Sequence, residues 1–296
     1  MDPRGVRLTR LPPTTYFLTS AVFHYLGPSL AVLLFARVDV LGVAWLRIAS
    51  AAVVFAVWRR PWRLLSGGSW RLFVALGLVL AAMNSLFYLA VDRLPLSTVG
   101  AVEFVGTLVL AALGVRTRRN VLALLLAVAG VALLTQVRLV AEPLGFVFAF
   151  ANGAGFVLYV VLADRIASPA DGSDPMAGID RLGLAMLVAA VAATSFGLLP
   201  ALPAFTHPLW LLWGIGVGLC SSVVPYVTDQ LAMARLPRAT FALMLSLLPA
   251  AATAIGFVVL GQVPTGRDLA GIALVVVGLV VHREAQSSER SPQSSG

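Results

Sequence analysis

Four ionisable side chains lie inside long apolar stretches of the sequence: His24, Arg47, Glu103 and Asp229. An Arg or Asp at the centre of a membrane helix costs about 2.5 to 3.5 kcal/mol on insertion scales, so such residues generally have a functional or structural reason. We predict that these four residues form a proton-coupling or substrate-binding site.

Glu103 is the acid deepest inside its apolar segment, and its neighbours Gly100 and Gly106 are small enough to let other groups approach. Because desolvation disfavours a charged carboxylate, this carboxyl could take up and release a proton near neutral pH. The alternative is a permanent structural ion pair with Arg47.

The other three ionisable residues each allow two interpretations. The fixed charge of Arg47 could hold a substrate carboxylate or the side chain of Glu103, or it could extend to the outer interface. Asp229 lies near the expected cytoplasmic end of a helix, where solvation of that end would account for it. His24 could be a hydrogen-bonded interior histidine or a proton relay.

Six further residues would line a cavity between the helices: Asn84, Tyr88, Asn152, Tyr159, Pro225 and Tyr226. Asn84 and Tyr88 are four residues apart, so they share one helix face. Asn152 and Tyr159, seven residues apart, share another. Pro225 frees backbone carbonyls that only a cavity or a neighbouring helix could satisfy. Ordinary hydrogen bonding between packed helices is the alternative explanation.

Motifs of catalysis and of metal or cofactor binding are missing from the sequence. It contains no His-Glu-x-x-His, no P-loop and no Gly-x-Ser-x-Gly, and its three histidines are scattered. The single cysteine, Cys220, excludes a disulfide framework and a cysteine metal cluster. We therefore expect a protein that is not an enzyme and that uses no metal and no cofactor.

The composition indicates a membrane protein. Of the 296 residues, 59% are hydrophobic and 11% are charged, whereas soluble domains contain about 25% charged residues. The net charge is +8, and every basic residue is arginine. In a membrane protein such an excess marks cytoplasmic loops rather than a nucleic-acid surface. The expected partners are the lipid bilayer and a small-molecule solute, with no nucleic acid.

Ten apolar runs predict ten membrane-spanning helices of roughly 20 residues, and so an all-α integral membrane fold. The runs are Thr15–Phe35, Val40–Trp58, Trp70–Val91, Ser97–Val115, Val121–Gln136, Pro143–Leu162, Leu182–Leu199, Pro208–Thr228, Ala239–Leu260 and Asp268–Val281. The segment 284–296, rich in Gln, Ser and charge, is expected to be a disordered tail.

The distribution of arginine predicts the orientation. With the N-terminus in the cytoplasm, sixteen arginines fall in inside segments, and four fall outside: Arg37, Arg93, Arg138 and Arg267. Because positive charge concentrates on the cytoplasmic side, both termini and the tail are expected there.

An internal repeat indicates two related halves. The sequence LAVDRLP at 89–95 recurs as LAMARLP at 231–237, an offset of 142 residues. Five expected helices in each half would make 1–140 and 141–283 two inverted five-helix repeats. Such repeats are typical of transporters, in which the halves exchange conformations around a midplane site. Chance similarity of two apolar stretches is the alternative.

Three segments resemble the EamA type of the drug/metabolite transporter superfamily and, within it, the bacterial threonine and homoserine exporters. They are MNSLFYL at 83–89, VEFVG at 102–106 and PYVTDQLAMARLPRATFAL at 225–243. The resemblance matches the family at Asn84, Tyr88, Glu103, Pro225, Tyr226 and Asp229. It departs at Leu248 and Gln262, where such exporters usually have glutamate.

The resemblance implies a secondary transporter of the bacterial inner membrane that exports a small metabolite, such as threonine or homoserine, against proton entry. Within transport, the alternative is movement of another solute, such as a cationic drug, in either direction. Outside transport, the alternative is a membrane-embedded sensor. For the oligomeric state, a monomer and a homodimer both stay open.

Overall fold

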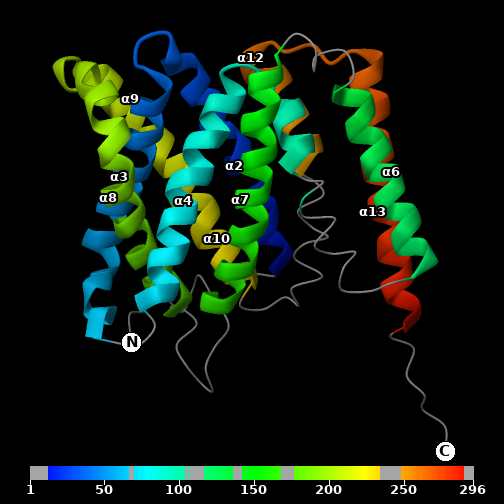
Figure 1. Cartoon of the computed structure of the whole chain (residues 1–296), viewed down its shortest axis with the longest axis horizontal. Helices are drawn as coiled ribbons and strands as arrows, with labels where there is room; N and C mark the ends of the chain where they lie inside the picture. The colour runs from blue at the N-terminus through cyan, green and yellow to red at the C-terminus, as the bar shows by residue number, and fades with distance from the viewer. Residues whose placement is uncertain are drawn as a thin grey trace, which may run out of the picture.

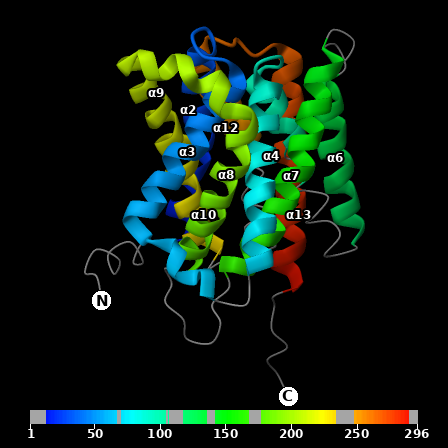
Figure 2. The same cartoon turned by 60° about the vertical axis from the view of Figure 1, so that its left-hand side comes forward.

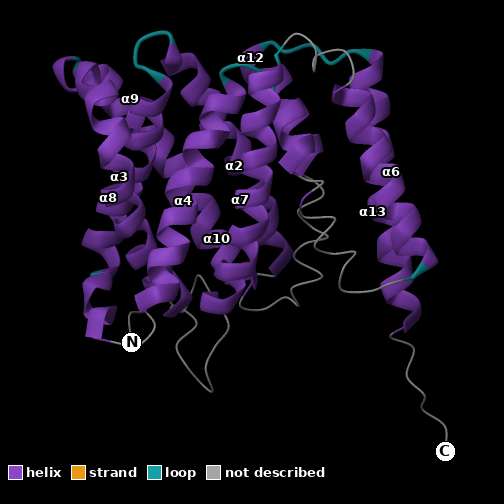
Figure 3. Ribbon diagram, in the orientation of Figure 1, coloured by secondary structure: helices purple, strands orange, loops and turns teal. Residues whose placement is uncertain are grey.

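A bundle of helices makes up the part of the chain that the computed structural model describes, residues 13–66, 70–103, 106, 117–135, 142–167, 177–233 and 248–289. These residues include no strand (Figure 3). The helices are α2 (Pro13–Phe35), α3 (Val40–Arg59), the 3-10 helix η1 (Pro61–Ser66), α4 (Trp70–Val91), α6 (Arg118–Thr135), α7 (Pro143–Ala167), α8 (Ala177–Thr206), α9 (Pro208–Gly218), the π-helix η2 (Leu219–Val223), α10 (Val224–Met233), α12 (Leu248–Leu260) and α13 (Gly266–Glu289). Residues 96–103 are also helical.

Six helical segments are long and apolar enough to cross a membrane. They are Thr15–Phe35, Val40–Arg59, Trp70–Val91, Pro143–Ile166, Ala177–Thr206 and Pro208–Met233. These segments confirm six of the ten expected runs and the all-α membrane class. The expected run 97–115 lies largely outside the described residues. Of the expected run 239–260, residues 248–260 are described and form α12.

Two helices extend beyond their expected ends. α8 continues through Pro200 and Pro203, because proline is tolerated in membrane helices where neighbouring groups satisfy the freed carbonyls. α13 continues to Glu289, so the expected disordered tail at 284–296 begins too early. The sequence Arg-Glu-Ala-Gln at 283–286 consists of strong helix formers, which favour this continuation.

A reciprocal hydrogen-bonded cap fixes where α13 begins. The backbone N–H and hydroxyl of Thr265 both donate to Oδ2 of Asp268, each at 2.8 Å, and the N–H of Asp268 donates back to the Thr265 hydroxyl at 3.2 Å. This arrangement is a capping box, which satisfies donors that the first turn of a helix leaves unpaired. The helix therefore begins at Gly266 rather than at the expected Asp268.

The helices pack in pairs across the bundle (Figures 1 and 2). α3 lies along α8, α6 lies along α13, α4 contacts both α7 and α8, and α2 contacts α10. Glycine allows the close approach of α3 and α8, as is usual in membrane helices. A Cβ at Gly42 would lie 2.5 Å from the backbone oxygen of Pro200, and a Cβ at Gly197 would lie 2.5 Å from Cβ of Trp45.

We expect Gly42→Ala to lower the free energy of unfolding by about 1 to 3 kcal/mol, because the added methyl group meets backbone that cannot rotate away. Gly216→Ala is the matched control, since nothing lies within 4 Å of a Cβ at that position. Thermal unfolding of the detergent-purified protein measures both variants. Equal melting temperatures would show that the contact between α3 and α8 does not depend on glycine.

Candidate functional site

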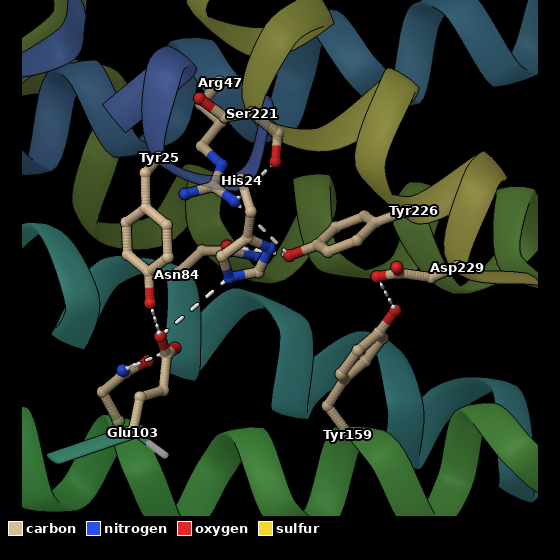
Figure 4. Close-up of polar contacts among 10 residues, drawn as sticks. His24, Tyr25, Arg47, Asn84, Glu103, Tyr159, Ser221, Tyr226 and Asp229 are labelled. Carbon is tan, nitrogen blue, oxygen red and sulfur yellow. Dashed lines mark hydrogen bonds and ion pairs between the residues drawn. The ribbon is translucent and has the colours of Figure 1, made fainter. Parts of the chain in front are cut away.

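The residues predicted to do chemistry come from six helical segments and meet inside the bundle (Figure 4). All four ionisable residues are buried: His24 on α2, Arg47 on α3, Glu103 in the helical residues 96–103, and Asp229 on α10. Between 2% and 7% of their surface is exposed. Their side chains fall into three groups, which centre on Glu103, Arg47 and Asp229.

Glu103 is held by neutral donors. Its Oε2 accepts a hydrogen bond from the Tyr25 hydroxyl at 3.2 Å, and its Oε1 accepts one from Nδ2 of Asn152 at 3.0 Å. Nε2 of His24 lies 3.9 Å from Oε2. The structural ion pair considered for Glu103 and Arg47 is not formed between these two described residues. Glu103 therefore has no arginine partner in the described chain.

Arg47 points into the bundle and not to the membrane interface. Its Nε donates to Oγ of Ser222 at 2.9 Å, and one terminal nitrogen donates to the backbone carbonyl of Ser221, also at 2.9 Å. The guanidinium lies 5.2 Å from the ring centroid of Tyr88, a cation–π distance. None of its contacts among the described residues is a carboxylate.

Proline chemistry accounts for the contact between Arg47 and the Ser221 carbonyl. Pro225 has no N–H, so it cannot donate to the carbonyl four residues earlier, which belongs to Ser221. The π-helix η2 also widens the backbone immediately before α10. A side chain of the neighbouring helix α3 thus satisfies the freed carbonyl. For Pro225 we expected either a neighbouring helix or a cavity to do so.

Tyr226 links α4 to α10. Its hydroxyl donates to Oδ1 of Asn84 at 3.0 Å and lies 3.5 Å from a terminal nitrogen of Arg47. Asn84 in turn donates through Nδ2 to the carbonyl of Leu80 at 2.7 Å. These contacts place Tyr226 between the guanidinium and the amide (Figure 4).

Asp229 is buried, and its expected place at a solvated helix end is wrong. The helix was expected to end at Thr228, but α10 continues to Met233 and carries Asp229 into the interior, where 2% of it is exposed. The Tyr159 hydroxyl lies 3.5 Å from Oδ2, whereas Oδ1 has no hydrogen-bond partner among the residues that the structure describes. Asp229 and Glu103 are therefore two separate buried carboxylates, on either side of Tyr226 (Figure 4).

A small cavity joins two of the three groups. It is lined by His24, Arg47, Met83, Asn84, Phe87, Glu103, Asn152 and Tyr226. Its volume of about 10 Å³ is near the minimum that one water molecule needs. An amino acid would not fit, so binding one requires the helices to separate. Tyr88, Tyr159 and Pro225, expected in the lining, lie beside the cavity residues without lining it.

Sequence reasoning missed several residues of this site. Met83 and Phe87 line the cavity, Tyr25 binds Glu103, and Ser221 and Ser222 bind Arg47. Only Ser221 had a readable signal, because it lies four residues before a proline inside a helix. In the described chain, no group of three His, Cys, Asp or Glu side chains is placed to hold a metal ion.

Comparison with known proteins identifies similar chains. Residues 143–282 match the model of the EamA-like transporter family. The chain is 30% identical over 269 residues to the threonine/homoserine exporter RhtA of Salmonella typhimurium, covering 88% of this chain and 89% of that one. It is 29% identical over 272 residues to the exporter RhtA of Escherichia coli, covering 89% and 90%. One solved crystal structure shares the fold, with a TM-score of 0.60 at 18% identity over 94% of this chain and 99% of the other.

Proposed function

The chain belongs to the EamA-like transporter family, and from this premise we propose that it exports a small neutral amino acid, such as threonine or homoserine, in exchange for protons. The protein is a multi-pass inner-membrane transporter and not an enzyme. Its similarity to the exporters supports the choice of substrate, and the chemistry of the cavity supports an amino acid.

One observation carries the proposal: two buried groups of opposite charge line the same cavity without pairing with each other. Arg47 has no carboxylate among its described contacts, and Glu103 has no arginine. A zwitterionic amino acid offers the complement of both, since its carboxylate would bind the guanidinium and its ammonium would bind the carboxylate. Asn84, Asn152 and Tyr226 could then hydrogen-bond a side-chain hydroxyl.

The surroundings of Glu103 suit the exchange of a proton for an ammonium group. Burial disfavours the charged carboxylate, whereas the hydrogen bonds from Tyr25 and Asn152 favour it. An arriving ammonium adds a second favourable interaction for the charged form and would release the proton. His24, 3.9 Å away, is the nearest group that could relay it, and Asp229 is a second buried carboxyl that could titrate.

We further propose ten spanning helices arranged as two inverted five-helix repeats, 1–140 and 141–283. In that arrangement α2, α3, α4 and α6 correspond to α7, α8, the segment α9–η2–α10 and α13. The packing supports this correspondence, because α4 contacts α7 and α8 while α9 to α10 contact α2 and α3. Asn84 and Tyr226, which hydrogen-bond each other, are also separated by the 142-residue offset of the repeat.

Export measured in proteoliposomes tests the proposed function. Purified protein is reconstituted with labelled threonine or homoserine on one side, and an imposed pH gradient is present or is dissipated with an uncoupler. We expect amino acid to accumulate against its gradient only while the proton gradient persists. Accumulation that is indifferent to the uncoupler would contradict proton antiport, and no flux of any neutral amino acid would contradict the proposed substrate class.

Both termini are proposed to face the cytoplasm. In support, α2 begins and α13 ends at the same end of the bundle (Figure 1). In a Cys220→Ser background, we expect Gly67→Cys to be protected in intact cells from an impermeant thiol reagent, because its loop would be inside. We expect His207→Cys, which is exposed between α8 and α9, to be labelled. The reverse pattern would invert the topology.

A further inference from the structure

A positively charged pocket lies where α3 ends, far from the cavity residues along the helix. It has a volume of about 320 Å³ and is lined by Trp58, Arg59, Arg60, Pro61, Arg63, Leu64 and Asp180. Three guanidinium groups and one carboxylate leave an excess of two positive charges (3 − 1 = 2). In Figure 2 the end of α3 that carries these residues lies at the lower left of the bundle.

One wall of the pocket is fixed by a paired salt bridge. Arg59 donates through Nε to Oδ1 of Asp180 and through a terminal nitrogen to Oδ2 at 2.9 Å, which joins α3 to α8. This bridge uses the only acid of the lining. Arg60 and Arg63 therefore form no ion pair with a carboxylate of the described chain, so an external anion could bind them.

The backbone at Arg60 adds an independent observation. Arg60 caps the end of α3 in the left-handed conformation, with φ 50° and ψ 53°. It is the one non-glycine residue with positive φ in the part of the chain that the structure describes. Glycine normally occupies this cap position, because a side chain makes the conformation costly. Such backbone strain points to a functional role for the side chain that is kept there.

The helix surface that leads to the pocket carries exposed apolar and tryptophan side chains, which suit contact with lipid. Val53 and Val57 on α3 are 61% and 75% exposed, and Trp58 and Trp62 follow them with 42% and 48% exposed. Exposed aliphatic side chains suit acyl chains, and tryptophan concentrates at the level of the headgroups. Apolar, aromatic and cationic side chains therefore follow one another from α3 into η1. A phospholipid has its acyl chain, its glycerol ester and its phosphate in the same order.

We propose that this pocket binds the phosphate of an anionic phospholipid. Arg60 and Arg63 hold the phosphate oxygens, the Trp58 ring lies beside the glycerol esters, and an acyl chain follows Val53 and Val57. Basic pockets between membrane helices hold anionic headgroups through the same charge complementarity. The salt bridge between Arg59 and Asp180 keeps α3 and α8 at the separation that the headgroup needs. The site is independent of the transport cavity.

Native mass spectrometry of the full chain, purified and supplied with equal phosphatidylglycerol and phosphatidylcholine, tests the proposal. We expect the wild-type protein to retain phosphatidylglycerol preferentially. The double variant R60Q/R63Q should bind it roughly 25-fold more weakly, from about a fivefold loss for each arginine. The matched control is R118Q/R119Q, which removes the same charge from exposed residues at the start of α6, on the same expected side of the membrane.

Each outcome of this measurement either supports or contradicts the proposed lipid site. Loss confined to R60Q/R63Q supports the pocket, whereas an equal loss in R118Q/R119Q would mean that surface charge in general attracts the lipid and would overturn it. Displacement of the lipid by millimolar inorganic phosphate would identify a soluble-anion site instead. If R60Q/R63Q does not purify as a folded protein, R60K/R63K keeps the charge but not the guanidinium geometry. It should retain an intermediate amount, and retention equal to the wild type would contradict the geometry proposed.

Discussion

Glu103→Gln is expected to insert and fold normally and to lose all export against a concentration gradient. Glutamine keeps the size of the side chain and an oxygen that can accept from Tyr25 or Asn152, but it cannot exchange a proton. Downhill exchange should persist with an affinity roughly tenfold to 100-fold lower, because a hydrogen bond to a charged group contributes about 1.5 to 3 kcal/mol. The dependence of export on pH should disappear with the carboxyl.

Labelled threonine in proteoliposomes, measured over a range of pH, distinguishes these effects. Asp92→Asn is the matched control, since it neutralises an acid that pairs with Arg93 near the surface and lies outside the cavity. If Glu103→Gln exports at the wild-type rate with an unchanged pH profile, the carboxyl is structural. The coupling role would then pass to Asp229 or His24.

Arg47→Met is expected to abolish selective recognition of the amino-acid carboxylate. The wild-type protein should prefer threonine to threonine amide, which lacks the negative charge, and the variant should lose that preference. Loss of a paired, charge-assisted contact predicts a fall of roughly tenfold to 100-fold in the affinity for threonine. Arg47→Lys keeps a charge but not the planar fork, which now reaches Ser221 and Ser222 together, so an intermediate affinity is expected.

Competition by threonine and by its amide against labelled threonine measures this preference directly. Arg37→Met provides the control, because this exposed arginine lies outside the cavity. Arg47→Met also leaves the buried Ser221 carbonyl without its donor, at a cost of about 1 to 3 kcal/mol in stability, so melting temperatures must accompany the competition. A destabilised variant that still discriminates threonine from its amide would assign Arg47 a purely structural role.

The sequence alone predicted that four ionisable side chains lie inside apolar runs, and all four are buried in the structure. It could not say which groups would meet. Arg47 and Glu103 were natural partners by charge, yet the guanidinium binds a backbone carbonyl that Pro225 leaves free. That outcome depends on how α3 is rotated against η2, which no residue spacing within one helix determines.

Helix ends and the contacts of aromatic residues were also not predicted from the sequence. Solvation of a helix end would account for Asp229 only if the helix ended near Thr228, and five more helical residues exclude that interpretation. Tyr25 had no signal, since one aromatic residue among apolar neighbours fits ordinary packing equally well. Its role follows only from a contact with Glu103, 78 residues away in sequence. Tyr88 was predicted to line the cavity, but its ring lies beside the Arg47 guanidinium and is not part of the lining.

The π-helix at Leu219–Val223 determines in which direction around the helix axis the side chains of α10 point. Each residue of an α-helix advances by about 100° around the axis, and a π turn holds one extra residue. α10 is therefore rotated by about that angle relative to an uninterrupted helix from Pro208. If this bulge were lost and the turn became regular α-helix, Tyr226 and Asp229 would swing by about that angle around the axis while the span stayed intact. A single shift in hydrogen-bond register could thus act as a pivot that reshapes one wall of the cavity.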